Sequence, residues 1–114
     1  MRSMKASYFT LEYFISEAGK IPFKEWLERL RDVNARAKVR IALDRISLGN
    51  FGHTKSVGEG VHELKIDYGP GYRVYYAFAG EAVVLLLVGG DKTSQSKDIT
   101  RAKECWNTFK HKRR

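Results

Sequence analysis

Alternation of apolar and polar residues characterises the second half of the chain. Residues 61–67 ("VHELKID") and 72–78 ("YRVYYAF") alternate with a period of two, which predicts two strands with unlike faces. The glycines and the proline of residues 68–71 ("YGPG") predict a turn, so the two strands form a hairpin. Residues 83–88 ("VVLLLV") are apolar throughout, which indicates a strand covered on both faces. Residues 7–15 mix aromatic and β-branched side chains, which predicts a further strand.

Helical spacing of apolar residues predicts three helices, over residues 22–30, 33–48 and 94–114. Pro22 suits the first turn of its helix, because the N–H that it lacks has no helical partner there. Residues 49–60 contain four glycines and predict a loop. The apolar stripes of the three helices consist of Phe23, Trp26, Leu27 and Leu30; Ala35, Val39, Ala42, Leu43 and Ile46; and Ile99, Ala102, Cys105 or Trp106, and Phe109.

The order of these elements is strand, helix, helix, three strands and helix, which places the chain in the α+β class. We expect a small, antiparallel-rich sheet packed on a helical hairpin, with a C-terminal helix. A chain of 114 residues suits one compact domain, and no repeat or linker interrupts its pattern. Residues 1–114 are therefore expected to form a single domain.

The chain is strongly basic. It contains 21 Lys and Arg residues against 13 Asp and Glu residues, which gives a formal net charge of +8 at pH 7. Such a surface favours a polyanion as partner, because basic side chains that meet phosphates release counterions. The alternative is a basic protein whose charge serves only solubility. The position of the charges in the fold decides between the two.

Cysteine content and apolar runs bear on the cellular compartment. Cys105 is the only cysteine, so no internal disulfide can form and a reducing compartment is expected. Residues 1–10 lack the apolar core of a signal peptide. The longest apolar run covers residues 82–88, which is far short of the roughly 20 residues that span a membrane. These features predict a cytoplasmic protein that does not cross a membrane.

One face of the predicted sheet carries the candidate site. Glu63, Lys65, Arg73 and Tyr75 fall opposite the apolar face, and Lys92 follows the last strand. A sheet face open to water also carries polar residues without any function, and an exposed Glu63–Arg73 ion pair contributes less than about 1 kcal/mol. Glycines at the same end of the sheet favour a site, because a backbone without side chains leaves room for a ligand. They are Gly69, Gly71, Gly89 and Gly90.

These residue types suit RNA cleavage by the neighbouring 2′-hydroxyl group, a route that requires neither a metal nor another cofactor. We expect Arg73, Lys65 and Lys92 to neutralise charge on the scissile phosphate and Glu63 to accept the proton of the 2′-hydroxyl. The ring of Tyr75 is expected to stack on a base. Further contacts to RNA are expected from basic residues of the second and third helices, namely Arg36, Arg40, Lys97 and Arg101.

The histidines do not indicate a metal site. His53, His62 and His111 lack the spacing of metal ligands, and no pair of cysteines accompanies them. His62 falls on the apolar face of its strand, which favours a structural role. We therefore predict no metal.

Three stretches of the sequence carry a resemblance to a known family. They are residues 62–76 ("HELKIDYGPGYRVYY"), residues 89–92 ("GGDK") and residues 96–106 ("SKDITRAKECW"). Together with the order of elements, they resemble the RelE/ParE superfamily of toxins from toxin–antitoxin pairs. The most similar branch is that of the addiction-module killer proteins, which are related to HigB toxins and to a phage-derived family. The resemblance extends from Tyr8 to Trp106.

The resemblance implies a RelE-like fold and a small cytoplasmic toxin that cleaves mRNA in the ribosomal A site. It also implies a cognate antitoxin, in this branch often a helix-turn-helix repressor, that keeps the toxin inactive. Arg73 matches the phosphate-stabilising arginine of RelE-type enzymes, and Lys92 matches the basic residue after the last strand. Glu63 stands where RelE-type proteins have a lysine that acts as base, and Lys65 follows two residues later. The C-terminal tyrosine of RelE-type enzymes, and the histidine and tyrosine of HigB-type ones, have no counterpart unless Tyr75 replaces them.

Two other functions are compatible with the same sequence. A ParE-like protein of the same fold inhibits DNA gyrase and cleaves no RNA, although the retained Arg73 and Lys92 favour a nuclease. A degenerate toxin acts only as the partner of its antitoxin. Expression of the protein distinguishes the three functions. An mRNA endonuclease arrests growth and cuts messages, a gyrase inhibitor causes an SOS response with intact messages, and a degenerate toxin is harmless.

Overall fold

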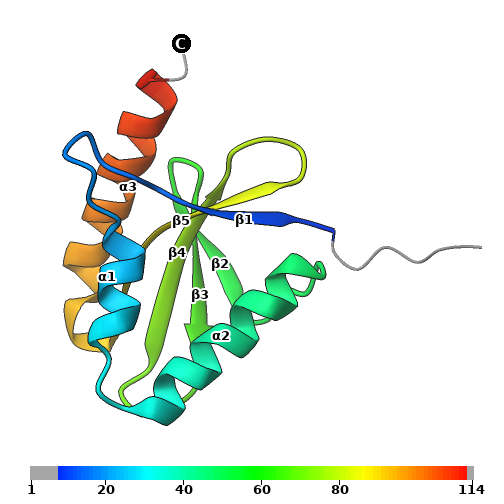
Figure 1. Cartoon of the computed structure of the whole chain (residues 1–114), viewed down its shortest axis with the longest axis vertical. Coiled ribbons are helices and arrows are strands. Elements are labelled where there is room, and N and C mark those ends of the chain that lie inside the picture. The colour runs from blue at the N-terminus through cyan, green and yellow to red at the C-terminus, as the bar shows by residue number, and fades with distance from the viewer. Residues whose placement is uncertain (1–7, 113–114) are drawn as a thin grey trace, which may run out of the picture.

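The computed structural model describes residues 8–112 and has the predicted α+β architecture, with helices packed on one sheet (Figure 1). The elements are β1 (Thr10–Tyr13), α1 (Pro22–Arg29), α2 (Val33–Ser47), β2 (Thr54–Gly58), β3 (Val61–Ile66), β4 (Tyr72–Phe78), β5 (Val83–Gly90), the short 3₁₀ helix η1 (Lys92–Ser94) and α3 (Gln95–Lys112). The predicted strand start at residue 7 and the predicted helix end at residue 114 lie outside the described residues. No helix within residues 8–112 is long and apolar enough to cross a membrane.

The strands form one five-stranded sheet in the order β1-β5-β4-β3-β2. β1 pairs with β5 in parallel, and the other neighbouring strands are antiparallel, which confirms the antiparallel-rich sheet. The predicted hairpin joins β3 to β4 and sets Lys65 opposite Arg73. On the other side of β4, Arg73 lies opposite Gly90 of β5. Arg73 therefore belongs to an interior strand, between Lys65 and Gly90.

The predicted loop over residues 49–60 contains the edge strand β2, so this prediction was wrong in part. β2 is polar and mostly exposed, and it lacks the apolar alternation that predicts a strand. Backbone pairing with β3 forms it instead. The turn between the two strands consists of Glu59 and Gly60, both with positive φ (58° and 84°), which is typical of a tight hairpin.

Helices cover both faces of the sheet. On the face of α1 and α2, the buried residues are Phe23, Leu27, Val39, Leu43, Ile46, Leu64, Val74, Tyr76, Val84 and Leu86. On the face of α3, they are Phe14, Val61, Tyr75, Ala77, Leu85, Leu87, Val88 and Ala102. The face that was expected to be open is therefore covered by α3. Packing of α3 on this face removes the apolar side chains of the helix and of the sheet from water together. Figure 1 shows α3 along one side of the sheet and α2 crossing obliquely on the other.

The helix ends connect α2 to the β3–β4 turn. Pro22 occupies the first turn of α1, as predicted. Asp32 caps α2, where its carboxylate accepts hydrogen bonds from the backbone N–H groups of Asn34 (2.9 Å) and Ala35 (3.2 Å). The hydroxyl of Tyr68, in the β3–β4 turn, donates to the same carboxylate at 2.9 Å and lowers the pKa of Asp32. This contact ties the turn to the start of α2.

Candidate functional site

Three of the predicted cations converge on one pocket of about 380 Å³ beside the β3–β4 turn. Lys65 and Arg73 are cross-strand neighbours, and Lys92 begins η1 just after β5. Among the described residues that line the pocket, Asp67 is the only carboxylate, and it lies 3.5 Å from the Lys65 ammonium group. We call this hollow the cationic pocket. Its lining favours an anionic ligand.

Arg73 is the buried member of the cationic pocket. It is 6% exposed, whereas Lys65 and Lys92 are exposed. Its Nη1 donates a hydrogen bond to the carbonyl of Gly71 at 2.7 Å. Its Nε lies 3.7 Å from Oε2 of Glu63 and finds no hydrogen-bond acceptor within residues 8–112. A planar guanidinium held at two points is oriented before any ligand arrives.

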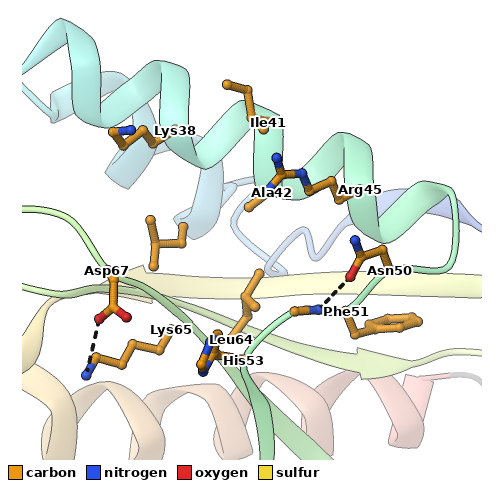
Figure 2. A pocket seen from close by; sticks show the side chains of 12 residues that line it. Lys38, Ile41, Ala42, Arg45, Asn50, Phe51, His53, Leu64, Lys65 and Asp67 are labelled. Atoms are coloured by element: carbon orange, nitrogen blue, oxygen red, sulfur yellow. Dashed lines mark hydrogen bonds and ion pairs between the residues drawn. The ribbon is translucent and has the colours of Figure 1, made fainter.

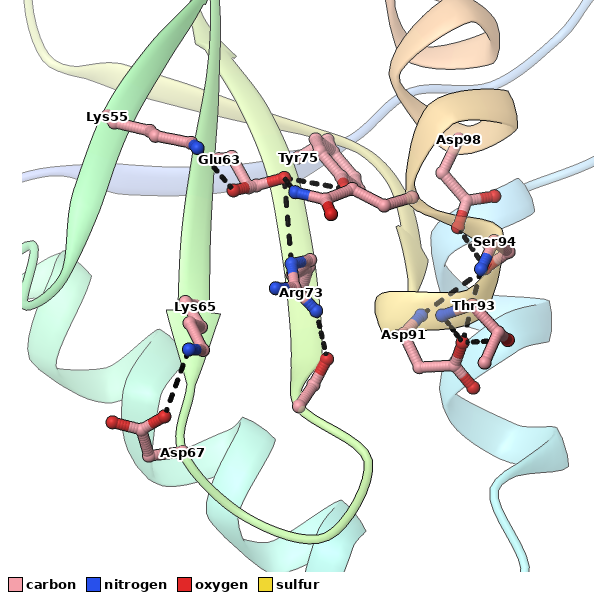
Figure 3. Close-up of polar contacts among 12 residues, drawn as sticks. Lys55, Glu63, Lys65, Asp67, Arg73, Tyr75, Asp91, Thr93, Ser94 and Asp98 are labelled. Carbon is pink, nitrogen blue, oxygen red and sulfur yellow. Dashed lines mark hydrogen bonds and ion pairs between the residues drawn. The ribbon is translucent and has the colours of Figure 1, made fainter.

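Glu63 lies next to Arg73 and gathers four contacts (Figure 3). It is only 3% exposed, not on an open face as the sequence predicted. Its Oε2 accepts hydrogen bonds from the Tyr75 hydroxyl and from Nε2 of Gln95, each at 2.8 Å. The Lys55 ammonium group is 3.8 Å from its Oε1. Two cations and two hydrogen-bond donors thus offset the cost of burying this carboxylate.

The ring of Tyr75 is fully buried between β4 and α3. Burial, together with the hydrogen bond to Glu63, raises the pKa of Tyr75 well above its usual value of 10.0. The hydroxyl is therefore protonated at neutral pH and donates to the carboxylate. The prediction that the Tyr75 ring lies on an open face was wrong. A buried ring has no free face on which a base could stack.

Two contacts of Glu63, those from Lys55 and Gln95, were not predicted from the sequence. Lys55 reaches Glu63 because β2 pairs with β3 and sets the two residues opposite each other. Gly58 and Gly60, just before the predicted strand, are a signal for a turn and so for a strand on its other side. Gln95 is the first residue of α3, and no local pattern marks it. Its contact with Glu63 depends on how α3 packs on the sheet.

A capped turn holds the backbone at Lys92. Oδ1 of Asp91 accepts hydrogen bonds from the N–H and hydroxyl of Thr93, at 2.9 and 2.7 Å, and from the N–H of Ser94 at 3.4 Å. The hydrogen bonds from Thr93 lower the pKa of Asp91, so its carboxylate is charged at neutral pH. The Ser94 hydroxyl donates in turn to the buried carboxylate of Asp98 (Figure 3). This network places Lys92 at the edge of the cationic pocket.

Gly89 and Gly90 leave room for the chain's own side chains, so their predicted role in admitting a ligand was wrong. A Cβ on Gly89 would lie 2.1 Å from the ring of Trp26. A Cβ on Gly90 would lie 1.8 Å from Oδ2 of Asp98. These glycines let α1 and α3 approach β5 closely. The other two predicted glycines, in the β3–β4 turn, line the cationic pocket.

The other basic residues predicted to contact RNA lie outside the cationic pocket. Arg36 and Arg40 belong to α2, and Lys97 and Arg101 belong to α3, on the opposite face of the sheet. Arg36 donates to the carbonyl of Leu30 and so supports the connection between α1 and α2. The other three are exposed. The structure does not bring these four side chains together.

Within residues 8–112, no group of three or more His, Cys, Asp or Glu side chains is arranged to hold a metal ion. His62 is half-buried and stacks on Tyr76, with ring centroids 5.3 Å apart, and burial lowers its pKa. Cys105 belongs to α3 and packs against the core on that face of the sheet, and burial raises the pKa of its thiol. Both side chains contribute to packing.

The structure is that of a small α+β protein, with helices on both faces of its sheet and the cationic pocket at one end. The chain belongs to the phage-derived Gp49-like family (DUF891), whose model matches residues 25–107. This family is toxin-like and is associated with toxin–antitoxin modules. An uncharacterized protein of Haemophilus influenzae is 47% identical over 83 residues, which cover 73% of this chain and 84% of that protein. No solved structure matches the chain.

Proposed function

We propose that this protein is the toxin of a toxin–antitoxin module and inhibits translation by cleaving mRNA on the ribosome. The convergence of Lys65, Arg73 and Lys92 on one pocket carries the proposal. Membership in the Gp49-like family and the formal charge of +8 support it. On this proposal residues 1–114 act in the cytoplasm as one RelE/ParE-like, HigB-related domain. Its partners are ribosome-bound mRNA and a cognate antitoxin of the helix-turn-helix class.

In the proposed reaction, a ribose 2′-oxygen attacks the adjacent phosphorus, and the bond from phosphorus to the 5′-oxygen breaks. The products are a 2′,3′-cyclic phosphate and a 5′-hydroxyl, so the proton lost by the 2′-hydroxyl is balanced by the one that the leaving oxygen gains. Negative charge grows on the phosphate oxygens, where Arg73, Lys65 and Lys92 stabilise it. The planar fork of Arg73 suits contact with two phosphate oxygens at once.

Glu63 positions Arg73 in this mechanism. Its carboxylate is 3% exposed and already accepts two hydrogen bonds besides its contact with Arg73. The role expected from the sequence, acceptance of the 2′-hydroxyl proton, requires the carboxylate to leave these partners. We therefore assign to Glu63 the orientation of the guanidinium.

Lys92→Ala is the decisive variant, because Lys92 is exposed and its removal leaves the core intact. Induction of the wild-type protein without an antitoxin is expected to arrest growth and to cut translated messages at sites mapped by primer extension. Lys92→Ala is expected to cleave about 100-fold more slowly, the order of effect for losing one group that stabilises transition-state charge. Lys24→Ala, which removes an exposed lysine of α1, is the matched control and is expected to match the wild type.

Three other outcomes of these experiments contradict the proposed nuclease or its site. Cleavage by Lys92→Ala at the wild-type rate excludes the cationic pocket as the site. Growth arrest with intact mRNA and an SOS response identifies a ParE-like inhibitor of DNA gyrase instead. Harmless expression of the wild-type protein identifies a degenerate toxin that acts only as the partner of an antitoxin.

A further inference from the structure

A second hollow lies on the α2 side of the sheet (Figure 2). It has a volume of about 350 Å³ and lies between α2, the segment that follows α2, and β3. We call it the α2 groove. Its apolar lining consists of Ile41, Ala42, Phe51, Leu64 and Ile66. Ile41 is 49% exposed, although the neighbouring apolar residues of α2 face the core. Apolar surface in a hollow of this kind is typical of a binding site.

Cations border the same groove. Lys38 and Arg45 lie along α2, and Lys65 lies on the opposite wall, as Figure 2 shows. Asp67, paired with Lys65 at 3.5 Å, is the one carboxylate among the described lining residues. Lys38 lies over the ring of Tyr68, 5.3 Å from its centroid. Within residues 8–112, neither Lys38 nor Arg45 has a carboxylate partner, so both remain available to a ligand.

We propose that the α2 groove binds an acidic, amphipathic segment of a partner protein. Apolar side chains of that segment pack on the lining, and its carboxylates pair with Lys38 and Arg45. A peptide fits this surface better than single-stranded RNA does. RNA binding of that kind uses successive aromatic platforms for the bases, whereas four of the five apolar lining residues are aliphatic.

Occupation of the α2 groove also acts on the cationic pocket. Lys65 lines both hollows, as does Asp67. A carboxylate of the bound segment that contacts Lys65 competes with a phosphate for the same ammonium group. The partner therefore inhibits cleavage by removing one of the three cations from the phosphate. This second step, unlike the binding itself, rests on the proposed function.

Binding is measured with the full chain and a fluorescein-labelled peptide built of alternating Leu-Leu and Glu-Glu pairs, by fluorescence anisotropy. Replacement of its glutamates by glutamine, or of its leucines by serine, is expected to weaken binding at least about tenfold. The double variant Lys38→Glu/Arg45→Glu is expected to weaken binding of the original peptide by a similar factor. The matched control is Lys24→Glu/Arg29→Glu, which reverses two exposed charges of α1 and is expected to leave binding unchanged.

Three results overturn the inference. The first is equal affinity of the protein for the glutamate and glutamine peptides. The second is equal weakening of peptide binding by the two double variants. The third is that Lys38→Glu/Arg45→Glu loses affinity for a labelled single-stranded RNA but keeps its affinity for the peptide. Peptide binding that follows the expected pattern, together with a wild-type protein that cleaves no mRNA, refutes the proposed function and leaves the groove assignment intact. Cleavage that saturating peptide fails to inhibit refutes the step through Lys65.

Discussion

The Nε of Arg73 lies 3.7 Å from Oε2 of Glu63, with both side chains almost fully removed from water. A buried ion pair adds little stability compared with apolar residues of the same shape, but the loss of one partner is costly because the other charge stays buried and unpaired. The orientation of Arg73 therefore depends on every residue that holds Glu63. Those residues come from β2, β4 and α3.

Glu63→Gln is expected to lower the free energy of unfolding by about 3 kcal/mol, the order of effect for breaking a buried ion pair. RNA cleavage is expected to fall as well, because Arg73 loses its charged partner. Urea denaturation and primer extension measure the two effects. Lys55→Ala, which removes only the exposed contact at 3.8 Å, is the control and is expected to cost less than about 1 kcal/mol. Lost cleavage with unchanged stability would identify Glu63 as the proton acceptor.

Tyr75→Phe keeps the buried ring and removes the hydroxyl that donates to Glu63. The expected loss is about 1.5–3 kcal/mol in the free energy of unfolding, since the acceptor is charged. Urea denaturation at neutral pH measures it. An unchanged midpoint contradicts the hydrogen bond.

The raised pKa of Tyr75 predicts a pH dependence at alkaline pH. The unfolded phenol ionises near its ordinary value of 10.0, whereas the folded one stays protonated. The contribution of the protonated Tyr75 phenol to the free energy of unfolding is therefore complete below pH 10.0. It falls as the pH rises above that value, because only the unfolded state releases the proton. Tyr75→Phe is expected to show a weaker decline in urea midpoint over this range. Equal declines in both proteins contradict the assignment.

Gly90→Ala is expected to lower the free energy of unfolding by about 1–3 kcal/mol, the usual cost of overpacking. The added Cβ would lie 1.8 Å from Oδ2 of Asp98, so either the Asp98 side chain or α3 itself must shift. In an Asp98→Ala background the same substitution is expected to cost less, since the obstructing oxygen is gone. A double-mutant cycle by urea denaturation measures the coupling. Additive costs would show that Asp98 is not the obstacle.

Asp91→Ala is expected to lower the free energy of unfolding by about 1 kcal/mol, as for other lost caps, and to slow cleavage because the turn at Lys92 loosens. The folded pKa of Asp91 lies below its ordinary value of 3.8, so the cap's charge contributes fully above that pH and is lost as the pH falls through the folded value. Asp44→Ala, on the exposed side of α2, is the control. Unchanged cleavage in Asp91→Ala contradicts the role of the cap in holding Lys92.

Periodicity predicted the fold because most elements bury a face of their own. The stripes of α1 and α2 and the alternation in β3 and β4 report that burial directly, and the structure confirms these elements. β2 escaped prediction because its residues are exposed and only backbone pairing with β3 creates the strand. The predicted helix over residues 94–114 corresponds to η1 and α3, but its stripe did not reveal which face of the sheet it covers.

The meeting of Arg73, Lys65 and Lys92 follows from the sequence alone, because a hairpin register and the end of a strand are local properties of the chain. The surroundings of Glu63, in contrast, depend on contacts between distant parts of the chain. Packing of α3 buries that carboxylate and brings Gln95 to it, and pairing of β2 brings Lys55. These contacts join segments far apart in the chain and depend on the surface that is removed from water, which no short stretch of sequence records.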